Sequence, residues 1–345
     1  MNKIYGQPVR VGSMPAKNIS ALRMIKFGFS ILVALIGLAL PARAWNNVGH
    51  RTVAELVWRQ MDDGERQAAS ELLRQHPHYK QYLAADVPAG VGTDEWVFLT
   101  AAVWPDWVRP AKKGQPAKPH SVTKYDLYPH AIGFPFLRAG DTNRALLENF
   151  PIAKPNAEMA LASSIATLKN PKASAPDRAV SLCWVLHLFG DLHQPLHAAN
   201  RVTRDKPHGE GLGGDYLVLD VRGKPIDMHA FWDQLPGVNR SYQTITALAD
   251  ELAATPGLQP EAMNEYQENK TIAAWVQESF RAAVDFAYSE DHIQFAYVGK
   301  LKPKDGSKVA TPAMSAAYLA GAKEIAHRRL VLAGRRAGDV IKQVW

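Results

Sequence analysis

The stretch from Arg178 to His197 reads RAVSLCWVLHLFGDLHQPLH and combines an apolar helical pattern with three histidines. Its periodicity predicts a helix from Arg178 to Leu192, and Ser174 is a typical residue to cap the start of that helix. Pro195 ends or kinks the helix, because proline has no amide hydrogen and its ring clashes with the preceding turn. The chain is therefore expected to turn sharply just after this helix.

The same stretch carries side chains that can bind a metal. His187 and Asp191 are four residues apart, so a helix points them the same way from consecutive turns, and the proline turn lets His197 come back toward them. Imidazole nitrogen and carboxylate oxygen are donors that zinc accepts. A single such pair is also an ordinary surface feature, so the metal interpretation needs further support. We expect His193 to make a structural hydrogen bond, and Gln194 is a candidate partner for the ligands.

Helical periodicity continues through most of the remaining chain. Residues Tyr216 to Val221 alternate as a strand, and a turn at 222–224 predicts a small β-ribbon. The intervals Pro105 to Asp141 and Asn200 to Gly214 are expected to be irregular. The fold class indicated is all-α: a single-domain helical bundle with a small β-ribbon. The other predicted helices are Val48–Met61, Glu65–Arg74, Asp94–Val103, Ala157–Leu168, Ile245–Leu252, Ile272–Tyr288 and Met314–Val344.

The first 44 residues differ from the rest of the chain. They carry six basic residues and no acidic one, and the apolar run from Phe27 to Leu40 is followed by small residues up to Ala44. This order is typical of a secretory signal peptide, so we expect residues 1–44 to be removed and residues 45–345 to form the mature domain. An uncleaved membrane anchor is the alternative, but the run is shorter than the ~20 residues of a bilayer span. A periplasmic or secreted protein without stable membrane association is expected.

Charge and cysteine content narrow the classes of protein to which the chain can belong. The chain has 40 Lys and Arg against 33 Asp and Glu, and removing the six leading bases leaves 34 against 33. A near-neutral mature chain gives no support for binding nucleic acid through a basic patch. Cys183 is the one cysteine, so no intramolecular disulfide can form, and its apolar helical surroundings predict a small core residue.

Further metal donors are spread along the sequence. His229 and Asp233 repeat the four-residue spacing, which makes metal binding the favoured interpretation. The free α-amine of a mature Trp45 could lose its proton to a metal, its carbonyl could close a chelate ring, and His50 could add a ligand. The remaining candidates are individually weak: Asp106 and Arg109 at the expected end of a helix, and His130 in the first irregular interval.

Taken together and in this order, these segments resemble the zinc-dependent single-strand-specific nuclease and 3′-nucleotidase family, the class I nucleases, and in particular its bacterial members. The resemblance covers the whole mature chain through W-x4-H, W-x-D-x2-R, a lone His before an aromatic-Pro pair, H-x3-D-x-H-Q-P-L-H, a GG pair and H-x3-D. It implies a helical monomer with three zinc ions per chain. The implied reaction hydrolyses single-stranded DNA, RNA and 3′-nucleotides to 5′-phosphate products through a metal-activated water.

The resemblance also implies a role for each donor. Nine ligand residues exceed what one tetrahedral zinc accepts, and clustered ions can clamp both oxygens of an in-line displacement. Asp233 stands where the related zinc phospholipases C use Glu, which favours the nuclease branch. The implied ligand sets are Trp45 and His50 for one zinc, Asp106, His130 and His187 for a second with Asp191 bridging the two, and His197, His229 and Asp233 for the third. The implied catalytic residues are Asp106, Arg109 (on the scissile phosphate) and Asp191.

The sequence departs from the family where the nucleobase would bind. Ala131 and Gly133 stand where the family commonly has a base-stacking aromatic residue and a base-binding acid, so that pocket is rebuilt or absent. Phe134 or Phe136 could substitute, although a core or rim position is the favoured interpretation of each. Two alternatives stay open: a lipid headgroup hydrolase of the zinc phospholipase C type, and an exported zinc-binding helical protein without activity.

Overall fold

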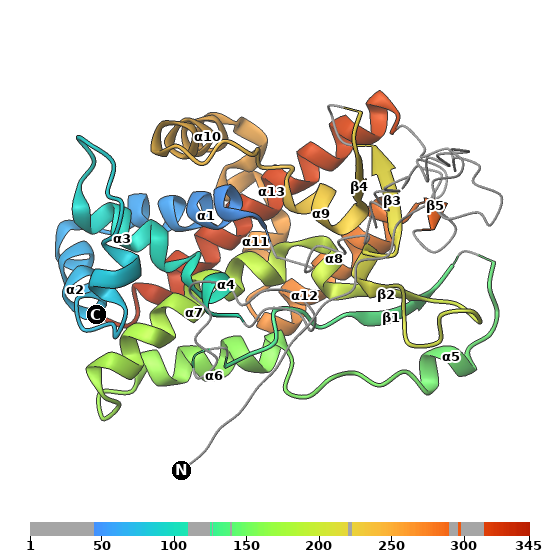
Figure 1. Ribbon diagram of the computed structural model, residues 1–345, viewed down its shortest axis with the longest axis horizontal. Helices are drawn as coiled ribbons and strands as arrows, with labels where there is room; N and C mark the ends of the chain where they lie inside the picture. The colour runs from blue at the N-terminus through green and yellow to red at the C-terminus, as the bar shows by residue number, and fades with distance from the viewer. Residues whose placement is uncertain are drawn as a thin grey trace, which may run out of the picture. The chain divides into compact units, whose positions relative to one another are not determined.

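Helix α7 (Ala175–His193) is the element around which the other long helices pack (Figure 1). Ser174 caps it by accepting a hydrogen bond from the backbone N–H of Asp177, as expected. Every residue from Ala179 to His193 is buried, as is typical of a helix that is apolar on all sides. Its neighbours are α1 (Asn47–Gln60), α6 (Ala157–Lys169), α12 (Ile272–Ala282) and α13 (Ala316–Ile341).

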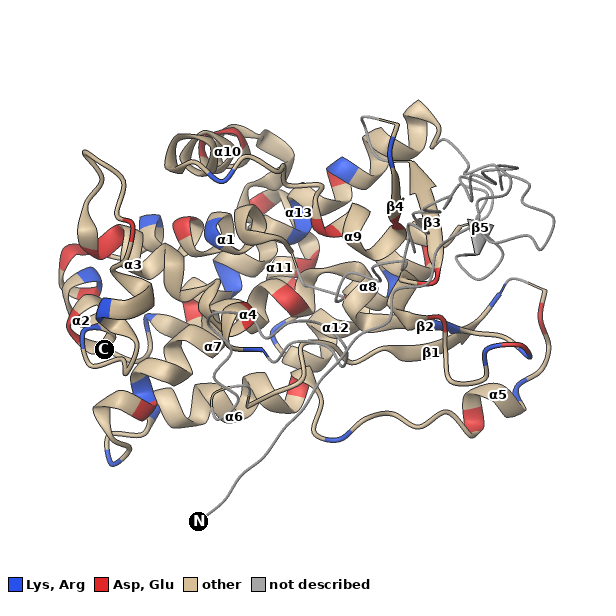
Figure 2. Cartoon of the chain, viewed as in Figure 1, with Lys and Arg blue, Asp and Glu red and all other residues tan. Residues whose placement is uncertain are grey.

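The computed structural model describes residues 45–109, 125, 127–138, 140–219, 223–289, 296–297 and 314–345. The predicted signal peptide, residues 1–44, lies outside the described residues. Within the described ranges no helix is both long and apolar enough to cross a membrane. Lys and Arg and Asp and Glu are both spread over the described helices (Figure 2), in agreement with the balanced charge of residues 45–345.

The predicted helices are confirmed, with ends that differ by a few residues. The last turn of the predicted Ile272–Tyr288 helix widens into a π-helical turn at Ala283–Ala287. The Trp104–Arg109 segment was expected to end the preceding helix, and this is wrong in detail. Pro105 instead lies in the first turn of a separate short helix, because proline cannot continue a helix but fits its start. The remaining helices are α2 (Asp63–Leu73), α3 (Thr93–Ala101), α4 (Trp104–Val108), α5 (Ala145–Glu148), α8 (Pro195–Ala198), α9 (Met228–Asp233), α10 (Tyr242–Ala254) and α11 (Asn264–Glu268).

Two small sheets complete the fold, which is mostly helical and forms a single domain as predicted. β3 (Tyr216–Leu219) pairs antiparallel with β4 (Pro225–Asp227), which confirms the β-ribbon, and β5 (Ala296–Tyr297) adds a third strand. The predicted end of the first ribbon strand, Val221, lies outside the described residues. A second sheet was not predicted: β1 (Phe134–Leu137) and β2 (Ala199–Val202) form a parallel pair inside the two intervals expected to be irregular.

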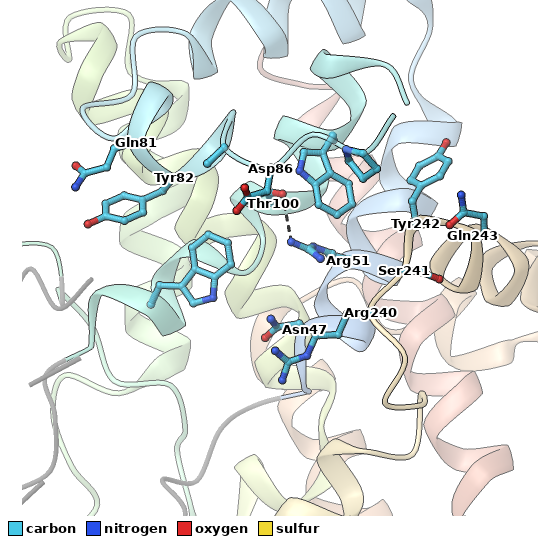
Figure 3. A pocket seen from close by; sticks show the side chains of 14 residues that line it. Asn47, Arg51, Gln81, Tyr82, Asp86, Thr100, Arg240, Ser241, Tyr242 and Gln243 are labelled. Carbon is cyan, nitrogen blue, oxygen red and sulfur yellow. Dashed lines mark hydrogen bonds between the residues drawn. The ribbon is translucent and has the colours of Figure 1, made fainter. Parts of the chain in front are cut away.

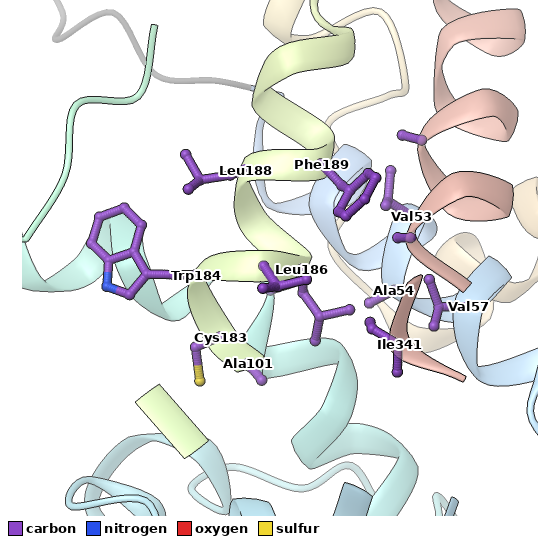
Figure 4. Close-up of a cluster of buried hydrophobic side chains, with 14 of the residues drawn as sticks. Val53, Ala54, Val57, Ala101, Cys183, Trp184, Leu186, Leu188, Phe189 and Ile341 are labelled. Carbon is purple, nitrogen blue, oxygen red and sulfur yellow. The ribbon is translucent and has the colours of Figure 1, made fainter. Parts of the chain in front are cut away.

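The main hydrophobic core lies between α1, α7 and α13. In Figure 4 Phe189 of α7 faces Val53 of α1, and Ile341 of α13 lies beside Val57 of α1. Cys183 is fully buried and unpaired in this core, which confirms its predicted role. A smaller core joins α8, α9 and the three-stranded sheet. The C-terminal end of α7, where the candidate ligands lie, packs between these two cores.

Candidate metal centre

The C-terminal half of α7 carries two of the predicted ligands, His187 and Asp191, and the turn after it leads to a third, His197. Nε2 of His187 lies 3.2 Å from Oδ2 of Asp191, its neighbour one turn along. α7 ends at His193, and the side chain of the next residue, Gln194, accepts a hydrogen bond from the N–H of Leu196 and caps α8. His197 of α8 therefore turns back, and its Nδ1 lies 2.6 Å from the carbonyl oxygen of His130. The turn expected at Pro195 is confirmed.

One group of donor atoms is formed by His130, His187 and Asp191, all buried. Nδ1 of His130 lies 2.8 Å from Nε2 of His187 and 3.0 Å from Oδ2 of Asp191. His187 is held by a hydrogen bond between its Nδ1 and the carbonyl oxygen of Ala102, at 2.8 Å. This bond leaves Nε2 directed at the group, as in metal sites whose histidines are oriented through their other nitrogen.

A second group adjoins the first and shares His187 with it. Its members are His50, Asp106 and His187, and the His50 ring stacks on the His187 ring with centroids 4.0 Å apart. Nε2 of His50 also lies 3.5 Å from Oδ1 of Asp191. Since Oδ2 of Asp191 faces the first group, this carboxylate stands between the two groups. The bridging role that the family resemblance implies for Asp191 stays a prediction, and this position is compatible with it.

The third group consists of His197 from α8 and His229 and Asp233 from α9. The Nε2 atoms of His197 and His229 are 3.1 Å apart, and Nε2 of His229 is 3.7 Å from Oδ2 of Asp233. Nδ1 of His229 bonds the carbonyl oxygen of Leu212 at 2.8 Å. Gln194 donates from Nε2 to Oδ1 of Asp233 at 2.8 Å, which fits the supporting role expected of it.

The hydrogen bonding of these groups fits bound cations. A carbonyl oxygen only accepts, so Nδ1 of His197 and of His229 carries the hydrogen, and each ring in its neutral form presents a lone pair at Nε2. Two lone pairs that face each other at 3.1 Å repel, and a cation between them would make the arrangement favourable. Within the described residues, both carboxylate oxygens of Asp106 and Asp191 are buried without a hydrogen-bond partner. Burial of such groups is costly unless a cation compensates them.

Burial also sets the protonation of the donors. It raises the pKa of Asp191 to about 6, against the opposing effect of His187, and holds the pKa of Asp233 well above its usual value. Burial lowers the pKa of His50 and of His130 well below the usual value, and nearby cationic groups add to this. These imidazoles are therefore neutral at pH 7, which is the form that binds metals.

Trp45 is fully buried beside the second group. The next residue, Asn46, donates its backbone N–H to the carbonyl oxygen of Asp233 and caps α1 with its side chain. Gly190 of α7 permits the close approach of α1, because a Cβ there would lie 2.7 Å from Nδ1 of His50 and 3.6 Å from Cδ1 of Trp45. Sequence reasoning missed Gly190, although a glycine inside a helix between His187 and Asp191 is a signal of close packing.

His193 and Arg109 are the two other residues that the sequence singled out near this site. His193 bonds the carbonyl oxygen of Phe189 through Nδ1 and Nη1 of Arg336 through Nε2, so its role is structural, as expected. Arg109 follows α4, and its Nη1 lies 3.5 Å from Oδ1 of Asp106. It is close enough to the second group to reach a substrate held there.

The backbone at Gly133 disfavours the acidic side chain that the family pattern has at this position. Gly133 has a φ of +66°, and a Cβ there would lie 2.8 Å from Cδ2 of Leu212. Phe136 is 8% exposed and packs against Phe280 and Tyr288, which confirms a core position. A nucleobase cannot stack on Phe136 in this structure.

A mostly helical domain with three adjoining His/Asp groups around the end of its central helix is a candidate multinuclear metal protein. A family model described as S1/P1 nuclease matches residues 45–345, and the chain belongs to this family. It is 24% identical over 208 residues to nuclease S1 of Aspergillus oryzae. The alignment covers 59% of this chain and 58% of that relative, so the chain spans little more than half of the relative's length.

Proposed function

We propose that the chain is a zinc-dependent phosphodiesterase that hydrolyses single-stranded DNA and RNA and 3′-nucleotides, leaving 5′-phosphates. The observation that carries the proposal is the position of Asp191, whose two oxygens face His50 on one side and His130 and His187 on the other. The family match supports nucleic acid as the substrate class.

In the structure Asp106 lies with His50 and His187, whereas His130 lies with His187 and Asp191. The proposed ligand sets instead follow the family resemblance. They are Trp45, through its amine and carbonyl, and His50; Asp106, His130 and His187, with Asp191 shared between these two sets; and His197, His229 and Asp233. Clustered zinc ions supply a water of lowered pKa and a clamp on the attacking and leaving oxygens. The protein orients the ligands through the carbonyl oxygens of Ala102, His130 and Leu212.

Arg109 is proposed to bind the phosphoryl oxygens. Its guanidinium sits beside Asp106 and is half-buried, at 26% side-chain exposure, so a charge-assisted hydrogen bond to phosphate would be only partly screened by water. A donor aimed at charge that grows in the transition state contributes about 10²–10³ in kcat.

Export is part of the proposal. The protein would be periplasmic or secreted, and cleavage after Ala44 would free the amine of Trp45. Export and metal binding would therefore both depend on the bond between Ala44 and Trp45. The start of the family match at residue 45 supports this boundary.

The test combines metal analysis of the processed protein with a substrate panel of single-stranded DNA, RNA, 3′-AMP and phosphatidylcholine. We expect three zincs per chain, cleavage of the first three substrates, and a fall of about 100-fold in kcat for Arg109→Gln with unchanged zinc content. Fewer than two zincs would refute the cluster. Preferred cleavage of phosphatidylcholine would show that the chain is a lipid hydrolase and not a nuclease. Bound zinc without cleavage of any substrate would show that it is a zinc-binding protein without activity.

A further inference from the structure

A second feature adjoins α1, the helix that carries His50. A cavity of about 590 Å³ opens between α1, α3, α4 and the start of α10, within the roughly 300–1,000 Å³ typical of small-molecule sites. Its wall includes Asn47 and Arg51 of α1 and Trp107 of α4. The cavity thus shares two helices with the metal centre, since His50 lies on α1 and Asp106 on α4.

Arg51 is the central side chain of this cavity. Figure 3 shows it pointing toward Thr100, with Arg240 and Asn47 nearby. Arg51 is 7% exposed and is held by a long contact of 3.5 Å to Oγ1 of Thr100 and by the face of Trp96, 4.2 Å from its guanidinium carbon. Burial and the charge of Arg240 lower the pKa of Arg51 to about 10.

No described carboxylate neutralises Arg51. Glu55, one turn further along α1, bonds Arg59 instead. Glu95 accepts a hydrogen bond from the hydroxyl of Tyr242. Asp86 lines the cavity but makes no ion pair with Arg51 in the described part of the chain. A buried arginine without a counter-ion is destabilising unless an anion binds it.

Unpaired donors and an available aromatic face point to the same kind of ligand. Nε of Arg51 and Nε1 of Trp96 are buried without an acceptor among the described residues. Both are donors, so the group that would satisfy them is an acceptor such as a phosphate. Trp107 is half-buried in the cavity wall and has no aromatic neighbour in the described ranges. Its ring can stack on a base.

We propose that this cavity binds one nucleotide unit of single-stranded nucleic acid outside the cleaved bond, with the phosphate on Arg51 and Arg240 and the base on Trp107. The proposal rests on the proposed function, because it extends the path of the same substrate away from the metal centre. A positive site combined with an aromatic platform is the usual arrangement for sequence-tolerant binding of single strands. It also offers this chain a base contact in place of the one lost at Ala131 and Gly133.

The test measures binding of the zinc-loaded protein to fluorescent single-stranded DNA of about twelve nucleotides, a length typical of such sites. Its linkages are phosphorodithioate, which keeps the charge and resists hydrolysis. We expect Arg51→Gln and Arg240→Gln each to weaken binding about ten-fold and to reduce the slope of log affinity against log salt by about 0.7. Trp107→Leu should weaken binding about ten-fold and leave that slope unchanged. Arg74→Gln, at an exposed arginine paired with Asp94 outside the cavity, is the matched control and should bind as the wild type does.

Arg240 is exposed, so its variant keeps the test decisive if Arg51→Gln does not fold. Wild-type binding and slope in Arg240→Gln together with wild-type binding in Trp107→Leu would overturn the proposal. The measured binding and cleavage distinguish the cavity proposal from the proposed phosphodiesterase activity. A protein that binds the DNA through these residues but cleaves no substrate supports the cavity and refutes the phosphodiesterase, whereas cleavage with unaltered binding in the variants refutes only the cavity.

Discussion

Gly190→Ala tests the metal centre through a single methyl group. Gly190 lies on α7 between His187 and Asp191, and a Cβ there would lie 2.7 Å from Nδ1 and 2.9 Å from Cε1 of His50. An ordinary contact begins near 3.4 Å, so the imidazole must retreat by about 0.7 Å. Zinc sites tolerate about 0.2 Å in their ligand distances, so we expect the ligand His50 to be lost from its ion.

The effect on folding should be small by comparison. Alanine is better than glycine in a helix by about 1 kcal/mol, whereas inserting a methyl group into a packed contact costs about 1–3 kcal/mol. The free energy of unfolding of the metal-free protein should therefore fall by about 0–2 kcal/mol. The variant should fold and yet lose one zinc per chain and most of its phosphodiesterase activity.

The assay pairs urea unfolding of the metal-free protein with zinc analysis by mass spectrometry after dialysis. Gly321→Ala is the control, since a Cβ there meets the ring of Phe286 at 2.6 Å and touches no candidate ligand. It should lose comparable stability and keep the wild-type zinc content. If Gly190→Ala keeps the full zinc content and activity, His50 is not a ligand in the arrangement described.

Three further outcomes are expected. Residues added before Trp45 should remove one zinc and most activity, measured against the same chain after proteolytic trimming; equal zinc in both forms would contradict an N-terminal ligand. Burial raises the pKa of Asp191 from 3.8 to about 6, so the folded metal-free protein holds this proton more tightly than the unfolded chain, and stability is lost as the pH rises through about 6. Relative to Asp191→Asn, the metal-free wild type should therefore lose about 2 kcal/mol between pH 4 and pH 7 in urea titrations, and parallel stability curves would contradict this. Gln194→Leu removes the hydrogen bond to Oδ1 of Asp233 and should weaken zinc binding by about 10–100-fold in a competition with a chelating dye; unchanged affinity would show that the bond does not orient the ligand.

Local spacing accounts for the parts of the site that could be predicted. His187 and Asp191, like His229 and Asp233, lie one helical turn apart, and a helix of known rise places them together wherever it packs. The cap at Ser174 and the stop at Pro195 depend on backbone chemistry within a few residues. The assembled groups could be proposed only because the order of the motifs resembles a known family.

The position of His130 could not be read from local spacing. It depends on hydrogen bonds from the N–H groups of Ile132 and Gly133 to the carbonyl oxygen of His197 and on the parallel pairing of β1 with β2. These partners are separated by more than sixty residues, and a four-residue strand has no distinctive pattern. Sequence reasoning therefore described this segment as irregular.

The amino-acid sequence by itself determined the helical fold class, the pairing of His with Asp on one helical face, the core position of Cys183 and the balance of charge. Each of these follows from composition or from residues within a few turns of one another. Only the tertiary structure decided that Asp191 stands between two groups, that Gly190 admits His50, and that Arg51 is buried without a carboxylate partner among the residues described. Burial and pairing arise where distant elements meet, so they depend on how the chain packs and not on the local order of its residues.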